Sequence, residues 1–338
     1  MEQDKPADNV AFGSAPDWLH SKLLKAAVSA ALLALLLWRI DLGALWENLS
    51  HVHPGLLALG VLTFLVANLV SIFKWYTIVR AQDIRVPYFY LTGLFYIGLF
   101  FNNFLPTSFG GDVVRMVKLS RATGRSVEAA SSVAMDRATS TVALLVIAAV
   151  PAAFELGLLG TRMLILIVAM LAGVLAMVAV LMSERAARRL GRLPLLRLNP
   201  MGLRRYFVSF YYSMHALQKN RGLMVTVLAI SLAYQCLQVI IVYFIALSLD
   251  IDIPVVYYFM FIPIVLAVSM IPFSLNGLGM REGAWVLLFG QVGVSSAAGF
   301  SMSILSFLVL TTVSLAGGVF YLFDRVDPAG ANDPAGAK

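Results

Sequence analysis

Two ten-residue stretches of the chain combine residue types that suit the binding of an anion. The first reads Pro106-Thr-Ser108-Phe-Gly-Gly111-Asp-Val-Val-Arg115, and the second reads Pro272-Phe-Ser274-Leu-Asn-Gly277-Leu-Gly-Met-Arg281. Pro, Ser, Gly and Arg recur at the same spacing in both. Unpaired N–H groups at a helix start attract anions, and an arginine can hold a phosphate through two parallel hydrogen bonds. The repeated motif therefore predicts a phosphate site built from two parts of the chain, the alternative being two surface loops with similar turn residues.

The two motifs also interrupt apolar runs of membrane length. Pro and Gly break helices, and irregular backbone at membrane depth persists only where protein or a water-filled cavity covers it. A matched pair of breaks, one in each half of the chain, is the best sequence indication of a transporter's central binding site. This placement favours the functional interpretation of the motifs.

Charged residues inside the apolar segments are the second group of interest, because each costs about 2.5–3.5 kcal/mol to insert. Asp112 and Arg115 are three residues apart and share a helix face, and Asp136-Arg137 lies about two turns into a later span. Two interpretations remain open. The arginines hold a ligand phosphate, or Arg115 pairs with Asp112 and Arg281 pairs with Asp136. Lys74, by contrast, is expected to anchor the chain at the membrane interface.

From these motifs we predict one substrate-binding set in which each residue type has a task. Arg115 and Arg281 hold phosphate, asparagines and glycines shape the chain breaks, and the carboxylates hold the arginines or take protons. The set comprises Asn103, Gly110, Gly111, Asp112, Arg115, Asp136, Arg137, Ser274, Asn276, Gly277, Arg281 and Glu282. No metal-ligand cluster, Walker motif or catalytic triad is evident, so we expect neither metal nor cofactor nor catalytic residues.

The composition identifies an all-α polytopic membrane protein. Of the 338 residues, 60% are hydrophobic and 13% are charged, whereas soluble domains carry about 25% charged residues. A net charge of +7 indicates lysine and arginine at the cytoplasmic face beside anionic lipid, not nucleic-acid binding. Six apolar runs are predicted to cross the membrane, at 23–38, 56–78, 129–154, 163–182, 223–249 and 297–323.

Basic residues predict the orientation. Residues 183–221 hold nine lysines and arginines against one acid and are expected to be a cytoplasmic loop, as is the N-terminus. If the basic segments are cytoplasmic, the segments 86–121 and 255–292 must each enter the membrane and return to the side from which they entered. We therefore expect two opposed re-entrant hairpins in an inverted repeat. A bundle of eight or ten complete spans has the same parity and remains the alternative.

The predicted organisation is one membrane domain with polar ends. Residues 1–21 form a polar N-terminal segment, residues 22–326 form the transmembrane domain, and residues 327–338 form an Ala-, Gly- and Pro-rich tail that is expected to be disordered.

The motifs resemble those of a known family. The pattern runs from Asn103 through Gly110-Gly111-Asp112-x-x-Arg115 and Asp136-Arg137 to Asn276-Gly277-x-Gly279-x-Arg281-Glu282. It is similar to the flippase-like membrane domain of lysylphosphatidylglycerol synthases, which also occurs alone in bacterial and archaeal membrane proteins. The synthases add an aminoacyl-transferase domain, whereas only a short tail follows the membrane domain here, so we expect the translocating part without the synthase activity. The resemblance implies a lipid substrate and a bacterial plasma (inner) membrane location.

The function expected on these grounds is a lipid transporter, or flippase, for an anionic phospholipid or a polyprenyl-phosphate-linked lipid. Its partners would be membrane lipids, and no nucleic acid is expected. One alternative is an integral-membrane enzyme of lipid or glycolipid synthesis, although the 183–221 loop offers few groups for acid–base catalysis. The other alternative is a non-catalytic partner of a lipid- or envelope-synthesis enzyme.

Overall fold

The computed structural model describes residues 42–104, 110–154, 215–217, 219–269 and 278–323. These residues form α-helices and no strands, as the composition predicts. The helices are α2 (Leu42–Ser50), α3 (Pro54–Arg80), α4 (Tyr88–Phe104), α5 (Gly110–Thr123), α6 (Ser126–Phe154), α11 (Arg221–Ser248), α12 (Val255–Ser269), α13 (Met280–Gly290) and α14 (Ser296–Phe323). The predicted N-terminal segment, most of the 183–221 loop and the predicted tail lie outside the described residues.

Four of the described helices are long and apolar enough to cross a membrane. They are Pro54–Arg80, Ser126–Ala149, Arg221–Ser248 and Ser296–Phe323, with 24 to 28 residues each, where about 20 suffice. They coincide with four of the six predicted spans, and the predicted spans at 23–38 and 163–182 lie outside the described residues. The chain is therefore a multi-pass membrane protein.

The two best-packed long helices, α3 and α11, run antiparallel. Proline stands at the first turn of α3, where its missing N–H is not needed, and the Asn220 side chain caps α11 by accepting a hydrogen bond from the Leu223 N–H at 3.1 Å. The His53 N–H donates to the Ser248 carbonyl at 2.8 Å, which joins the start of α3 to the end of α11. Gly60 allows α3 to lie close to the backbone of α11 at Ile241.

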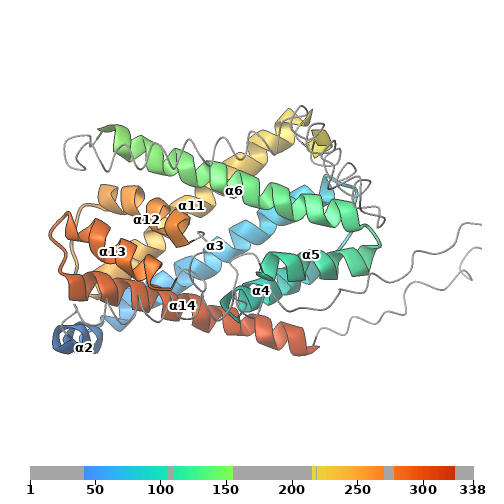
Figure 1. Ribbon diagram of the computed structural model, residues 1–338. Helices are drawn as coiled ribbons and strands as arrows, with labels where there is room; N and C mark the ends of the chain where they lie inside the picture. The colour runs from blue at the N-terminus through green and yellow to red at the C-terminus, as the bar shows by residue number, and fades with distance from the viewer. Residues whose placement is uncertain (1–41, 105–109, 155–214, 218, 270–277, 324–338) are drawn as a thin grey trace, which may run out of the picture.

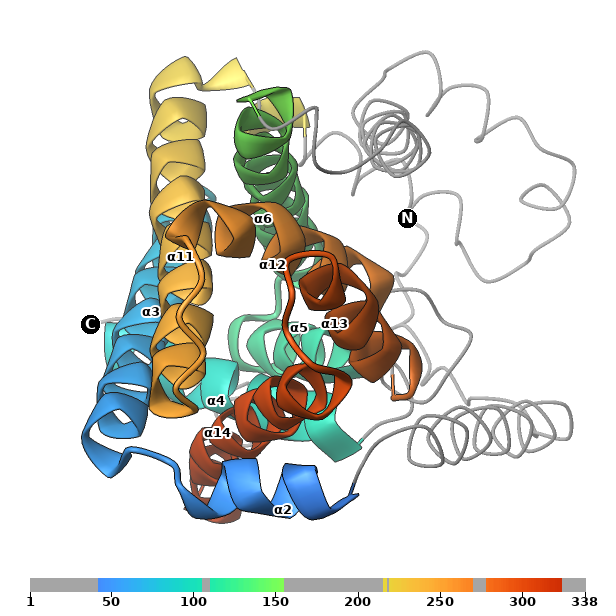
Figure 2. The ribbon, with the colours of Figure 1, turned by 90° about the vertical axis from the view of Figure 1, so that its left-hand side faces the viewer.

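Two pairs of shorter helices attach at opposite ends of this framework (Figure 1). The pair α4–α5 follows the end of α3 at Arg80 and leads into α6. The pair α12–α13 follows the end of α11, which lies beside the start of α3, and leads into α14. The end-on view places α12 and α13 in front and α4 and α5 behind (Figure 2).

The helix α4 is held at close range between α5 and α14. A Cβ atom on Gly111 of α5 would lie 1.8 Å from the Gly98 carbonyl oxygen, and one on Gly317 of α14 would lie 1.9 Å from the Tyr96 carbonyl oxygen. Real Cβ atoms do not approach so closely. Glycine at these two positions is therefore what lets the three backbones touch, as small residues do between membrane helices generally.

Replacing Gly111 with alanine is expected to lower the free energy of unfolding by about 1–3 kcal/mol or more, because α4 and α5 must separate to admit the methyl group. The apparent melting temperature of the purified protein in detergent measures this. Gly283→Ala is the matched control, since a Cβ there meets nothing within 4 Å and alanine favours the helix. Equal stability of the two variants would contradict the close packing.

Candidate functional site

Five charged side chains from three helices form a continuous chain of ion pairs, here called the charge chain. Lys74 Nζ of α3 lies 2.8 Å from Asp136 Oδ1 of α6. Asp136 Oδ2 accepts a hydrogen bond from Arg115 Nη2 of α5 at 2.7 Å, and the same Nη2 lies 3.0 Å from Asp112 Oδ1. Asp112 Oδ2 accepts from Arg137 Nε at 2.5 Å. The charges therefore alternate along the chain, which begins and ends with a cation.

Local sequence explains why these side chains meet. Asp112 lies in the first turn of α5, where a carboxylate complements the helix dipole, and Arg115 follows one turn later on the same face. The Asn102 side chain accepts a 2.7 Å hydrogen bond from the Gly111 N–H, which fixes the start of α5. Arg115 also lies 4.8 Å from the centre of the Trp75 ring, and the Trp75 indole donates to Ser132 Oγ. These contacts hold Arg115 in one orientation.

Lys74 is the member of the charge chain that sequence reasoning missed. Its expected role as an interfacial anchor is wrong, because its side chain is 0% exposed. Its Nζ donates to the Asp136 carbonyl oxygen at 3.1 Å and to Ser140 Oγ, besides contacting the Asp136 carboxylate. The position of Lys74 in its helix could have indicated burial. Lys74 lies six residues before the end of α3, which is about 9 Å from that end along the helix axis.

The two arginines of the charge chain differ in how exposed their side chains are. The Arg115 side chain is 4% exposed and is bound to both carboxylates, whereas the Arg137 side chain is 35% exposed. Only Nε of Arg137 donates to Asp112, so both of its terminal amino groups lack a hydrogen-bond partner among the described residues. When all three basic side chains are charged, they outnumber the two carboxylates, and the charge chain has one positive charge in excess. It can bind an anion, and Arg137 is its accessible end.

The second motif contains a different, balanced arrangement. Arg281 Nε donates to Glu282 Oε1 at 3.0 Å, and the Arg281 guanidinium lies 4.8 Å from the centre of the Phe307 ring. Glu282 Oε2 accepts from the Gly279 N–H at 2.6 Å, so this carboxylate occupies the start of α13. The interpretation in which Arg281 pairs with Asp136 is wrong, because Asp136 is bound by Lys74 and Arg115.

The remaining predicted residues are placed as follows. Asn103 donates to Ser314 Oγ at 2.5 Å and thereby ties α4 to α14. Gly110 and Gly111 are buried at the start of α5. Ser274, Asn276 and Gly277, like Pro106 and Ser108, lie outside the described residues. In the described part of the chain, no group of three or more His, Cys, Asp or Glu side chains that could hold a metal lies together.

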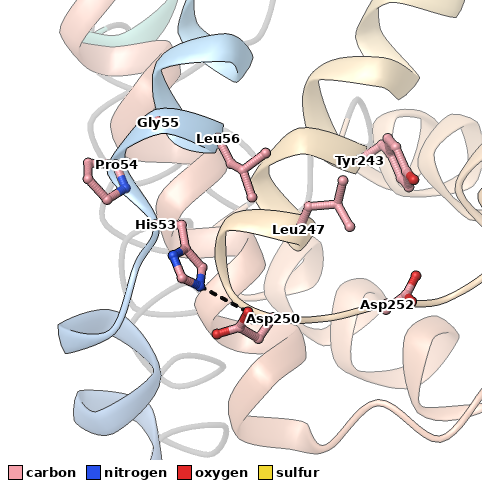
Figure 3. A pocket seen from close by; sticks show the side chains of 8 residues that line it. All are labelled: His53, Pro54, Gly55, Leu56, Tyr243, Leu247, Asp250 and Asp252. Carbon is pink, nitrogen blue, oxygen red and sulfur yellow. Dashed lines mark hydrogen bonds and ion pairs between the residues drawn. The ribbon is translucent and has the colours of Figure 1, made fainter.

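A depression of about 700 Å³ lies at the end of α3 opposite Arg80 (Figure 3). His53 Nε2 and Asp250 Oδ1 approach to 3.1 Å at its rim, and both side chains are more than half exposed. An ion pair so open to water contributes little to stability. Lys74 is twenty residues along α3, about 30 Å away, so this depression is separate from the charge chain.

Comparison with known proteins identifies the family of the chain. No curated protein and no solved structure matches it. The family model described as the lysylphosphatidylglycerol synthase TM region matches residues 22–318, a range that includes the whole charge chain and the Arg281–Glu282 pair. The resemblance inferred from the two motifs is thereby confirmed, and the chain belongs to the lysylphosphatidylglycerol synthase TM region family.

Proposed function

We propose that the protein moves a lipid with an anionic head group between the two leaflets of the membrane. The observation that carries the proposal is the charge chain, which ends at the partly exposed Arg137 and has three basic groups for two carboxylates. Ionisable residues inside membrane spans are rare and usually mark a substrate or ion pathway. The family supports a role connected with lipid synthesis, and the charge chain within the matched membrane region suggests translocation of an anionic lipid as that role.

Arg137 is the residue proposed to contact the head group. Its two amino groups, which have no hydrogen-bond partner among the described residues, match the two oxygens of a phosphate, with which arginine forms parallel hydrogen bonds. Asp112 holds Nε of the same guanidinium and so orients it without occupying the amino groups. Arg115, which the motif alone suggested as the phosphate ligand, is better suited to bridging the two carboxylates, because its Nη2 contacts both. Arg281 is the weaker candidate, since Glu282 already neutralises it.

We propose further that the two short helix pairs are re-entrant hairpins of an inverted repeat, within a fold of about six full spans. At 1.5 Å per residue, the helices α4, α5, α12 and α13 are about 16–26 Å long, whereas the hydrocarbon core is about 30 Å thick. Their attachment to opposite ends of α3 supports opposed entry. In this arrangement the chain breaks at both motifs would lie near the middle of the membrane, where repeat-built transporters bind substrate.

The orientation proposed for the bundle follows from its basic residues. Arg80, Arg121 and Arg125 lie at the end of the bundle where α3 and α5 finish and α6 begins. Lysine and arginine favour the cytoplasmic side. We therefore place this end, the N-terminus and the 183–221 loop in the cytoplasm of a bacterium, with the protein in the plasma (inner) membrane.

Leaflet exchange in liposomes tests the proposed function. We expect the reconstituted protein to accelerate exchange of at least one anionic lipid in a panel of an anionic phospholipid, a zwitterionic phospholipid and a polyprenyl phosphate. Arg137→Gln should slow that exchange at least about tenfold, which corresponds to about 1.4 kcal/mol and is within the energy of a charged hydrogen bond.

Arg121→Gln is the matched control for this assay, because Arg121 is an exposed arginine on α5. It should exchange lipid at the wild-type rate. Exchange of no lipid in the panel by folded protein, under an imposed potential and proton gradient, would count against transport and favour an enzyme or partner role.

A further inference from the structure

We propose that Lys74 takes up one proton when the anionic head group binds and releases it when the head group leaves, so that each anionic lipid is carried with a proton. The inference rests on the proposed lipid transport and adds its coupling. It is carried by the arrangement of the charge chain, in which Lys74 is the buried end and Arg137 is the accessible end.

Without the charge of Lys74, the charge chain is balanced and every remaining ion is paired. Asp136 keeps Arg115 at 2.7 Å, and Asp112 keeps both arginines. Two carboxylates then face two guanidinium groups. A protonated Lys74 is paired with Asp136 at 2.8 Å, but it gives the charge chain a net positive charge at a side chain that is 0% exposed, and burying that net charge is costly. The empty site therefore favours the neutral amine, and a bound monoanion favours the ammonium.

Lysine is the one basic group of the charge chain that can release a proton, because arginine stays charged in proteins. The groups around Lys74 Nζ can form hydrogen bonds with both the ammonium and the neutral amine. Ser140 Oγ can accept a hydrogen bond from the ammonium or donate one to the neutral amine, and the Asp136 carbonyl oxygen accepts from either. The uptake forms one N–H bond at Nζ with a proton from water, and release breaks that bond and returns the proton to water.

The groups around Lys74 come from several helices, and they leave the assignment to lysine intact. The helices α4, α12 and α14 contribute no Asp, Glu, Lys, Arg or His in their described ranges. Among the described residues, the titratable or charged groups near Lys74 are Asp136 and Arg137 of α6, Asp112 and Arg115 of α5, and Tyr234 of α11, whose ring centre lies 5.9 Å from Nζ.

Anion binding at Arg137 changes the protonation of Lys74 through the two carboxylates of the charge chain. A phosphate on the Arg137 amino groups competes with Asp112 for that guanidinium, so Asp112 relies more on Arg115. Arg115 uses the same Nη2 for Asp112 and Asp136, so a stronger bond to one weakens the bond to the other. Asp136 then gains from a charged Lys74 at 2.8 Å. By linkage, a proton on Lys74 must strengthen anion binding by the same factor.

Titration calorimetry measures binding and proton uptake together. Detergent-solubilised protein is titrated with short-chain phosphatidylglycerol at one pH in buffers of different ionisation enthalpy, and the dependence of the heat on the buffer gives the protons taken up. We expect about one proton per bound lipid for the wild type. Lys74→Arg keeps the charge and should bind the lipid with no proton uptake. Lys219→Arg makes the same change at an exposed lysine and should behave like the wild type.

The outcomes separate the coupling from the proposed function. Absence of lipid binding by folded wild-type protein would contradict the proposed function itself. Binding by the wild type without proton uptake, or unchanged uptake in Lys74→Arg, would overturn the role of Lys74 and leave anion binding in place. Proton uptake that disappears in Lys74→Arg alone supports the coupling.

Discussion

Asp136→Ala is expected to lower the free energy of unfolding by about 3–5 kcal/mol, because removing one partner of a buried ion pair leaves the other charge uncompensated. Asp136 is 4% exposed and is shared by Lys74 and Arg115, so its loss affects two buried basic side chains at once. Lys74 and Arg115 come from different helices, and Asp136 is the carboxylate that joins α3 to α5 through α6. The apparent melting temperature of the purified protein in detergent measures the loss.

Two comparisons identify the cause of that effect. Adding Lys74→Met to Asp136→Ala removes the buried amino group that has lost its carboxylate partner, and it should recover part of the lost stability. Glu128→Ala removes a carboxylate from the partly exposed pair with Arg125 and should change stability by about 1 kcal/mol or less. If Asp136→Ala were as mild as Glu128→Ala, the charge chain would not hold these helices together.

Arg115→Lys is the second large expected effect, although it keeps the charge. One guanidinium nitrogen of Arg115 lies within reach of Asp112 and Asp136, and the planar group lies against the Trp75 ring. A lysine ammonium takes the place of the guanidinium carbon, one bond short of Nη2, and it stacks less well on the Trp75 ring. We expect the loss of at least one charged hydrogen bond, worth about 1.5–3 kcal/mol of stability, again measured by thermal unfolding.

The matched control is Arg121→Lys, which makes the same change at an exposed position of the same helix. It should leave stability unchanged. A variant Arg115→Lys as stable as this control would show that Arg115 acts as a simple point charge. The different roles proposed for Arg115 and Arg137 would then have no support.

Much of the helical framework could be predicted from apolar run length alone, because a membrane helix needs no partner to satisfy its backbone. The runs at 56–78, 129–154, 223–249 and 297–323 all correspond to long helices. The closeness of α4 to α5 and α14 could not be predicted, since it depends on which glycines face one another across helices.

The ion pairs were predictable only in part. Asp112 and Arg115 are one helical turn apart, so their contact follows from local geometry. Lys74 and Asp136 are separated by 62 residues, and nothing local indicates that α3 and α6 bring them to 2.8 Å. Arg281 is bound by one oxygen of its sequence neighbour Glu282. The other oxygen of that carboxylate accepts from the Gly279 N–H at the helix start.

The selectivity of lipid exchange at position 137 tests the central claim most directly. In liposomes containing both lipids, the ratio of anionic to zwitterionic phospholipid exchange would be measured for the wild type, Arg137→Lys and Arg137→Gln, each at equal amounts of folded protein. If the excess positive charge of the charge chain binds the head group, the ratio falls toward one in Arg137→Gln and falls less in Arg137→Lys. An unchanged ratio in Arg137→Gln would contradict the claim that Arg137 selects an anionic lipid.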